Sequence, residues 1–363
     1  MAVPTFVRKV VRSCLRIGKK DRVMICSWRH MMSLAEAFAM ECKRNGAHTI
    51  VELLSDDVWY DAVTNLPLDF VEIPDPFSLA LADVATANIF FSGPENPERM
   101  KGVPAERWVA LSRADRPYYE KIVERKVRTA ELTLGHVTPQ RARTYGFDYK
   151  AWDKNVRDAT DVEYASMQQL GQKLAKILEK SREVEITSPE GTNLSFSLEG
   201  RRAHVKDGVI DDEDIEMGAI FSSLPDGSVL VAPTETSAEG FLKSNTPFPH
   251  AGSLVESLSL SFDNGRLSAF AGGKNSEALR NMWEKATGNK DRIGWLQLGL
   301  NPKASIGFTY DHIVLGTATI GIGLNKELRG RNESDWGLPV TLEKSTVKLD
   351  GKMIIKQGKL CVS

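Results

Sequence analysis

The sequence of 363 residues predicts two unlike halves: an α/β half with a mostly parallel sheet, then an antiparallel, β-rich half. Short apolar runs alternate with helical patterns up to about residue 182, which is typical of a flavodoxin-like or Rossmann-like sheet covered on both faces. Beyond that point, short alternating runs are separated by Asp-Gly and Asn-Gly turns, which indicate antiparallel hairpins. The length fits two domains of about 150 residues each. We therefore expect domains at 1–182 and 183–363.

The first half begins with a basic helix at 7–15, where apolar residues recur at helical spacing. Apolar runs then predict four strands, at 21–27, 48–54, 87–92 and 107–111. Further helices are predicted at 31–45, at 116–134 and, as one long helix bridging the two halves, at 158–182. Ser27-Trp28-Arg29-His30 stands after the first strand in place of a GxGxxG motif, which argues against a dinucleotide site. His30 itself lies where open α/β sheets place ligands, although a loop before a helix explains it equally well.

The second half predicts strands joined by tight turns and interrupted by one helix at 276–286. The alternation of apolar and polar residues places these strands at 184–187, 193–198, 228–232, 257–263, 266–271, 346–349 and 353–356. Antiparallel pairing of such strands gives a β-rich domain.

Charge and composition exclude several classes of function. The chain has 47 Lys and Arg against 48 Asp and Glu, a balance that argues against nucleic acid or an anionic membrane as partner. The most apolar windows, 77–93 and 313–324, contain Asp83 or are rich in Gly and Thr, so we expect no membrane span and a cytoplasmic protein. The four Cys form no CxxC, and none of the six His lies within five residues of another. The sequence therefore lacks a compact metal-binding motif.

Several segments of the second half, taken in order, carry a family resemblance. They are SPEGTNL at 188–194, LPDGSV at 224–229, SAEG at 237–240, LGLNPKA at 298–304, LGT at 315–317 and GLN at 323–325. Their order and spacing resemble the thermophilic aminopeptidase family of the aminopeptidase T and S type. The resemblance implies an α/β first domain, a β-rich second domain, a homodimer, a peptide-like or other small substrate and a two-metal centre.

The metal-ligand positions of that family carry other residues in this sequence. Ser228 and Trp295 stand where the family has glutamates, Thr319 stands where it has a histidine, and Gly337-Leu338-Pro339 replaces its closing His-x-Asp. A dinuclear centre needs carboxylate and imidazole ligands, which these side chains cannot supply. A related branch of the same scaffold resembles an iron-dependent dioxygenase of hydroxypyridines, whose single metal needs two histidines and a carboxylate at overlapping positions. This sequence has none of these ligands there either. We therefore expect no metal and no other cofactor.

The remaining polar residues near these positions are the candidates for chemistry. Asp311 next to His312 could orient an imidazole as general base, although adjacent strand residues point to opposite faces. The loop residues Glu235 and Glu239 could bind a substrate ammonium, and Arg331 with Asn332 could clamp a carboxylate or phosphate. The complete set of substrate-binding candidates is Glu235, Glu239, Arg331, Asn332, Trp295 and Thr319. Structural roles compete with each of these assignments, and for Glu239 we favour the structural role.

Three hypotheses of function follow. The leading one is a small-molecule hydrolase or lyase that uses a pocket between the two domains without the metal pair of the family. The second is a non-catalytic binding or assembly protein on the same scaffold. The third is a metal-dependent aminopeptidase with relocated ligands, taken from Asp311, His312, Glu235 and Glu239.

Overall fold

The computed structural model describes residues 3–100, 102–250 and 253–362 and contains two compact units. Unit 1 comprises Met1–Arg143, Asp148–Asp161 and Gly208–Pro225, and unit 2 comprises Thr144–Phe147, Val162–Asp207 and Asp226–Ser363. Residue 182 lies within unit 2. The domain boundary near it stays a prediction, because compact units report packing and not independent folding.

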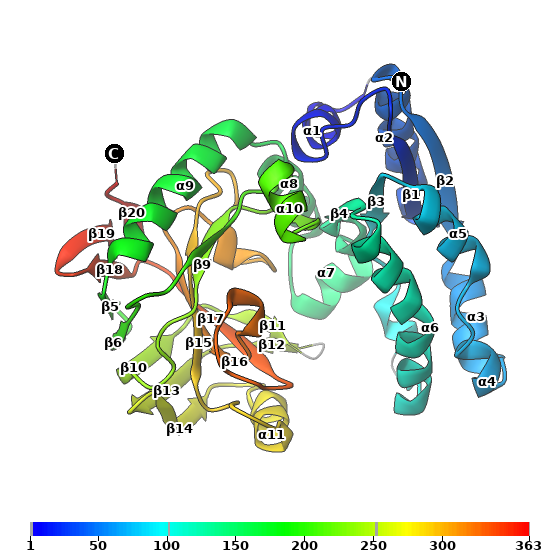
Figure 1. Cartoon of the computed structure of the whole chain (residues 1–363). Helices are drawn as coiled ribbons and strands as arrows, with labels where there is room; N and C mark the ends of the chain where they lie inside the picture. Colours follow the sequence, from blue (N-terminus) through cyan, green and yellow to red (C-terminus); the bar gives the residue numbers. More distant parts are fainter. Residues whose placement is uncertain (1–2, 101, 251–252, 363) are drawn as a thin grey trace. The chain divides into compact units, whose positions relative to one another are not determined.

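Unit 1 contains a parallel sheet of five strands in the order β2-β1-β3-β4-β8 (Figure 1). The strands are β1 (Arg22–Trp28), β2 (His48–Leu54), β3 (Ala87–Phe91), β4 (Arg128–Leu132) and β8 (Phe221–Leu224). This is the flavodoxin-like order, with its fifth strand supplied by a segment much later in the chain. The predicted α/β class of the first half is confirmed.

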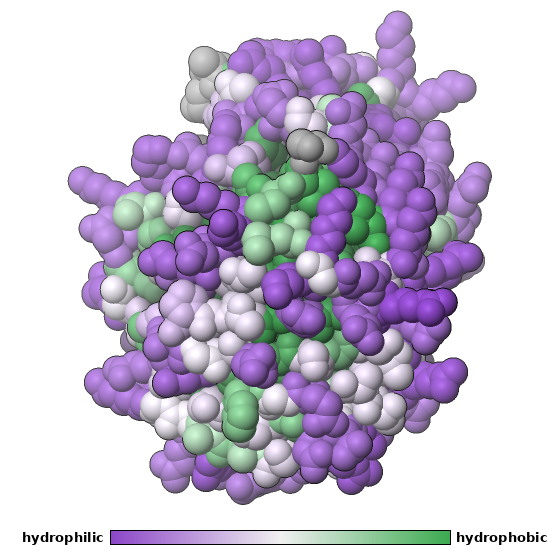
Figure 2. Space-filling view, turned by 90° about the vertical axis from the view of Figure 1, so that its left-hand side faces the viewer, coloured by the Kyte–Doolittle hydropathy of each residue, from purple (hydrophilic) through white to green (hydrophobic). Residues whose placement is uncertain are grey.

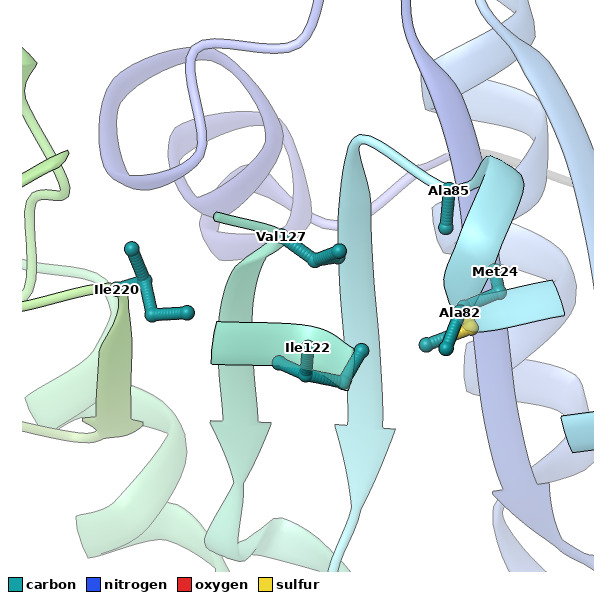
Figure 3. Close-up of a cluster of buried hydrophobic side chains, with 6 residues drawn as sticks. All are labelled: Met24, Ala82, Ala85, Ile122, Val127 and Ile220. Atoms are coloured by element: carbon teal, nitrogen blue, oxygen red, sulfur yellow. The ribbon is translucent and has the colours of Figure 1, made fainter. Parts of the chain in front are cut away.

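Helices α5 and α6 cover part of one face of this sheet. Met24, Ala82, Ala85, Ile122, Val127 and Ile220 form a buried apolar cluster, in which α5 and α6 meet β1 and the beginnings of β4 and β8 (Figure 3). The helices of this part of the chain are α1 (Thr5–Lys9), continued by a π-helix at Val10–Cys14, α2 (Met32–Arg44), α3 (Asp56–Asn65), α4 (Leu68–Val71), α5 (Pro76–Val84), α6 (Ala105–Glu124), α7 (Pro139–Tyr145), α8 (Tyr149–Thr160) and α10 (Asp212–Met217). Short 3-10 turns occupy Arg29–Met31, Pro97–Met100 and Thr133–His136.

The strand predicted at 107–111 is wrong. Those residues lie in α6, and the fourth strand of the sheet is β4, inside the segment predicted as a helix. A short apolar run fits either a buried strand or a helix, and here Ala110 alone within the run is buried, unlike a strand in the interior of a sheet.

The single long helix predicted at 158–182 is also wrong, because the chain forms α8 and then α9 (Tyr164–Lys180). The N–H of Asp161 closes α8 by donating to the carbonyls of Arg157 and Asp158, each at 3.0 Å. The Asp161 carboxylate pairs with Lys9 at 3.0 Å, and Val162 is buried. These tertiary contacts fix the break between the helices.

Unit 2 is antiparallel, as predicted for the second half, and has two main sheets. Sheet B has the order β14-β13-β10-β6-β5-β18-β19-β20, and sheet C has the order β17-β16-β15-β9-β7. The strands are β5 (Glu183–Thr187), β6 (Asn193–Ser197), β7 (Ala203–Lys206), β9 (Ser228–Val231), β10 (Glu239–Ser244), β11 (Phe248–His250), β12 (Ser253–Val255), β13 (Leu258–Asp263), β14 (Arg266–Gly272), β15 (Ile293–Gly299), β16 (Ala318–Gly323), β17 (Gly337–Leu342), β18 (Thr346–Leu349), β19 (Lys352–Lys356) and β20 (Lys359–Leu360). Helix α11 (Glu277–Lys285) and 3-10 turns at Asp311–Ile313 and Lys326–Leu328 complete the unit.

Helix α9 packs on sheet C through a close approach at Gly171. A Cβ at this position would lie 2.6 Å from Cγ1 of Val205 on β7 and 3.2 Å from Cδ1 of Leu300, which follows β15. The helix therefore covers the face of sheet C that Val205 occupies, and leaves the opposite face to other groups.

The surface that carries α9, β18 and β19 shows apolar areas between charged side chains (Figure 2). A groove of about 520 Å³ lies there, with lysines of α9 and β19 around an apolar floor that includes Ile177 and Ile354. Asp350 at its edge accepts the backbone N–H groups of Arg182 and Glu183 at 3.0 and 2.9 Å and so caps β5. None of the predicted site residues lines this groove.

Candidate functional site

Sheet C has one apolar and one polar face. Paired strand residues share a face, and successive residues alternate between faces. The pairing of Gln297 with Thr319, and of Thr319 with Thr341, therefore sets a polar row across β15, β16 and β17. Leu298 and Ile320 point to the other face and are fully buried. The polar face is the candidate site.

The four positions identified by the resemblance meet on this polar face. Trp295 pairs with Gly321, and Gly323 pairs with Gly337, so these residues share the face of Thr319. A Cβ on Gly321 would lie 1.8 Å from the Trp295 ring, and one on Gly337 would lie 3.6 Å from its Cη2 atom. The indole therefore lies over Gly321 and reaches Gly337. The structure brings the predicted residues Trp295 and Thr319 onto one surface.

The polar side chains of this face are hydrogen-bonded to one another. Nε2 of Gln297 donates to Oγ of Ser228 at 3.0 Å, and Thr319 shares a hydrogen bond with Thr341 at 2.9 Å. Ser228 and Thr319 are 0% exposed. The centre of the face is thus neutral, and it offers hydroxyl and amide groups in place of carboxylates or imidazoles.

Several titratable side chains lie at or near the β7 edge of the polar face, among them His204, which pairs with Leu230, the partner of Gln297. Lys206 pairs with Ser228 across β7 and β9, and Asp226 precedes β9 by two residues. Burial raises the pKa of Asp226 to about 7, against the opposing effects of the Gly227 N–H and Lys206. Burial, reinforced by Lys206, lowers the pKa of His312 to about 4. At neutral pH this edge therefore combines a carboxyl close to its pKa with a neutral imidazole.

Lys206 and Asp226 are not among the residues predicted from the sequence. Asp226-Gly227 has the pattern of an ordinary turn, and no strand was expected at Ala203–Lys206. Only the folded chain shows that the turn is buried beside β7. The signal available in the sequence was a carboxyl, Asp226, two residues before Ser228, one of the positions identified by the family resemblance.

Asp226→Asn is expected to stabilise the protein at alkaline pH. Because the pKa of Asp226 is raised in the folded state, its contribution to stability is greatest below the unfolded pKa and is lost as the pH rises through about 7. At pH 8 the variant should exceed the parent by on the order of 2–4 kcal/mol, and near pH 4 the two should agree. Urea unfolding at both pH values measures this difference. Equal stability at pH 8 would contradict a raised pKa.

Asp311 and His312 lie in a 3-10 turn, not at a strand edge, and no hydrogen bond joins their side chains. Their predicted role as an acid–base pair stays a prediction. Oδ1 of Asp311 accepts the N–H groups of Gly307 and Phe308, each at 3.0 Å. Burial raises the pKa of Asp311 to about 6 against these two hydrogen bonds. The His312 ring lies edge-on to Tyr310, with the ring centroids 6.2 Å apart. Asp311 thus fixes its own loop, while His312 stands beside Lys206.

Glu235 is a buried junction between three segments. Its carboxylate accepts hydrogen bonds from Nη2 of Arg201 at 2.6 Å, from the N–H of Arg331 at 2.7 Å and from Nδ2 of Asn325 at 3.2 Å. Burial acts to raise its pKa, but these hydrogen bonds outweigh it and hold the pKa below its usual value. Glu235 therefore joins three loops, with three hydrogen bonds to Oε1 and one to Oε2, and its predicted role in binding a substrate ammonium stays a prediction.

The other loop candidates also have structural partners. Exposed Glu239 accepts the Asn264 N–H at 2.6 Å, and buried Asn332 donates to the carbonyls of Ile293 and Gly323 at 2.9 and 2.8 Å. Arg331 is exposed and contributes its backbone N–H to Glu235. Their predicted roles in substrate binding stay predictions.

In unit 1, His30 and Trp28 lie at the carboxyl end of β1, as predicted. Nε2 of His30 is 2.9 Å from the Gly135 carbonyl, and the Trp28 ring occupies the space where a side chain on Gly93 would lie. The indole fills the point at which the strand order of the sheet reverses.

No three His, Cys, Asp or Glu side chains at 3–100, 102–250 and 253–362 are grouped so that they could hold a metal ion. Helices with the length and apolar character needed to cross a membrane are likewise absent from this part of the chain.

Comparison with known proteins shows which family this chain belongs to. The profile of the family described as Thermophilic metalloprotease (M29) matches residues 3–306. Aminopeptidase AmpS of Bacillus subtilis (strain 168) is 22% identical over 210 residues, or 53% of this chain and 50% of AmpS. The match therefore spans about half the length of that relative.

Solved structures show the same fold. Wild-type AmpT from Thermus thermophilus matches with a TM-score of 0.76 and 17% identity over 98% of each chain. 2,5-Dihydroxypyridine dioxygenase from Pseudomonas putida KT2440 matches with a TM-score of 0.64 and 16% identity, over 99% of this chain and 96% of that one. The AmpT likeness confirms the fold class. Because the family profile covers most of the sequence, the chain belongs to the thermophilic metalloprotease (M29) family of aminopeptidases.

Proposed function

We propose that this chain is a metal-independent enzyme on the M29 scaffold, which hydrolyses or cleaves a small, peptide-like substrate at the polar face of sheet C. The observation that carries the proposal is the convergence of Ser228, Trp295, Thr319 and Gly337 on that face. These positions meet as the resemblance requires, yet their side chains include neither a carboxylate nor an imidazole. The residues present therefore do not fit the two-metal centre of the family.

The packing on the face supports loss of the centre rather than a shift of it. The Trp295 indole fills the space between Gly321 and Gly337, and the neighbouring hydroxyl and amide groups bond to one another. Relocated ligands have little support, because the Glu235 carboxylate is already bonded to Arg201, Arg331 and Asn325. We therefore derive no catalytic step through a metal ion.

Asp226 is the proposed proton-transfer group. A carboxyl with a pKa of about 7 can both donate and accept a proton at neutral pH, which is the property that general acid–base catalysis requires. His312, whose pKa burial and Lys206 lower to about 4, stays neutral at this pH and can accept a hydrogen bond or proton. Ser228 and Thr319, both 0% exposed, hold Gln297 and Thr341 in place by hydrogen bonds and so shape the face that receives the substrate.

The test is hydrolysis of a panel of aminoacyl p-nitroanilides and small amides with EDTA present throughout. The proposal predicts turnover that EDTA does not affect, with a pH profile that changes near pH 7 and a loss of about 100-fold or more in Asp226→Asn. Glu213→Gln, a change of an exposed side chain in the first turn of α10, serves as the control and should leave turnover unchanged. Turnover that EDTA abolishes and Co²⁺ or Zn²⁺ restores would contradict metal independence.

A non-catalytic binding protein is the second candidate, favoured by the position of Trp295 over the former ligand positions. Saturable binding of a dipeptide without turnover, weakened in Thr319→Val but not in Asp226→Asn, would support it over the enzyme.

A homodimer and a cytoplasmic location are further proposals. The exclusion of nucleic acid as a partner rests on the balance of 47 basic and 48 acidic residues.

The dimer rests on the family resemblance. Light scattering after size exclusion should give twice the mass of the chain. A mass of one chain would contradict the dimer.

A further inference from the structure

A groove of about 600 Å³ lies in unit 1, far along the chain from sheet C. Trp59 of α3 forms one wall, and α6 forms the other through Trp108, Asp115 and Tyr119, with the ion pair of Arg116 and Glu120 beside them. Positions 108, 115 and 119 are spaced by seven and four residues, so they share one side of the helix. The size is that of a small-molecule site.

The aromatic rings of the groove are held in place from inside the unit. Trp28, only 5% exposed, meets Trp59 edge-on with the ring centroids 5.9 Å apart, and Trp59 meets Trp108 at 6.0 Å. The outer rings thus rest on a buried one. A rigid aromatic wall reduces the entropy lost when a ligand binds.

Asp115 has no cation beside it. No ion pair or hydrogen bond joins its carboxylate to another of the described residues, and burial raises its pKa above the usual value. The arginines of α6 have other partners, since Arg107 donates to the Val63 carbonyl, Arg113 to Glu72 and Arg116 to Glu120. The groove therefore combines aromatic faces with an unpaired negative charge.

Helix α3 also carries an example of a cation bound by an aromatic ring and a carboxylate. Next to Trp59, the ring of Tyr60 is covered by the guanidinium of Arg99, whose carbon lies 4.4 Å from the ring centroid. Arg99 also bonds to Asp57 at 2.6 Å. A cation is thus held there between an aromatic face and a carboxylate. The groove has both partners, an aromatic face and a carboxylate, and its own arginine, Arg116, is paired with Glu120 at 2.7 Å and not with Asp115.

We propose that the groove formed by α3 and α6 binds a small organic cation with an alkylated ammonium head. The head lies against the faces of Trp59 and Trp108, with Asp115 as its counter-ion. Aromatic rings attract such cations through their quadrupole, and Trp does so most strongly. A neutral ligand of the same shape would fill the groove but leave Asp115 unpaired.

Isothermal titration of the full chain with choline, and with its neutral isostere 3,3-dimethylbutan-1-ol, tests the proposal. We expect saturable binding of choline at one site, and binding of the neutral isostere weaker by about tenfold or more. Asp115→Asn should weaken choline binding by about tenfold, whereas Glu106→Gln, on the same helix outside the groove, should change it less than twofold.

Three outcomes would overturn the proposal. They are no saturable heat with choline, equal affinity for the isostere, and equal losses in Asp115→Asn and Glu106→Gln. The comparison of the two ligands uses the unaltered protein, so it stays decisive if a variant fails to fold. A groove covered by a second copy of the chain would show itself as the first of these outcomes.

Discussion

Replacing Glu235 by alanine is expected to lower the free energy of unfolding by about 3–5 kcal/mol. The substitution leaves the Arg201 guanidinium, whose side chain is 16% exposed, without its carboxylate. It also removes the acceptor for the Arg331 N–H and for Asn325. A buried charge left without its partner is among the most destabilising single changes. Chemical denaturation followed by circular dichroism measures the loss.

Glu239→Ala is the matched control for this prediction. Glu239 is exposed and makes one hydrogen bond, to Asn264, so its removal should cost no more than about 1 kcal/mol. A loss below 1 kcal/mol in Glu235→Ala as well would show that the junction of loops contributes little to stability.

The contribution of Glu235 to stability is expected to change with pH in the opposite direction to that of Asp226. The pKa of Glu235 is lowered in the folded state, so its contribution is present above the unfolded pKa and is lost as the pH falls through the folded value. Acid should therefore destabilise the parent more steeply than Glu235→Gln. Parallel stability curves below pH 5 would contradict this assignment.

Gly321→Ala is expected to destabilise the protein by about 2–3 kcal/mol through steric conflict with Trp295. The added Cβ would lie 1.8 Å from the indole, and Gly321 is held in β16 by pairing with both β15 and β17. The ring must move, or the sheet must distort. The melting temperature of the variant reports the cost.

A double-mutant cycle shows whether the indole is the cause. Trp295→Ala alone removes packing and should cost about 2–4 kcal/mol, but in that background Gly321→Ala should be nearly neutral. An additive double mutant would mean that Trp295 does not lie over Gly321. Ser276, which follows β14 in sheet B, offers a control substitution away from sheet C.

The sequence predicted the classes of both halves and seven of the fifteen strands that the structure describes in unit 2, because alternation and Asp-Gly turns are local signals. Its predicted strands did not include β15, β16 and β17, which form the polar face. It failed at 107–111, where four apolar residues fit strand and helix alike. It failed again at 158–182, where Lys9 and the burial of Val162 mark the end of a helix. Both errors depend on contacts with residues distant in the sequence.

The site shows the same division. Short motifs located Ser228, Trp295, Thr319 and Gly337, and strand pairing brings these positions together. The partners of Glu235 come from segments 34 to 96 residues away and leave no local pattern. The raised pKa of Asp226 arises from burial, which becomes visible only when β7 and β9 pair.

Metal content tests the central claim most directly. The protein is purified, incubated with Zn²⁺, Co²⁺ and Mn²⁺, passed through a desalting column and analysed by inductively coupled plasma mass spectrometry. The proposed loss of the two-metal centre predicts far less than one ion per chain and a melting temperature that EDTA does not change, because no ion stabilises the folded state. Two ions per chain, removed by EDTA with a fall in melting temperature, would contradict it.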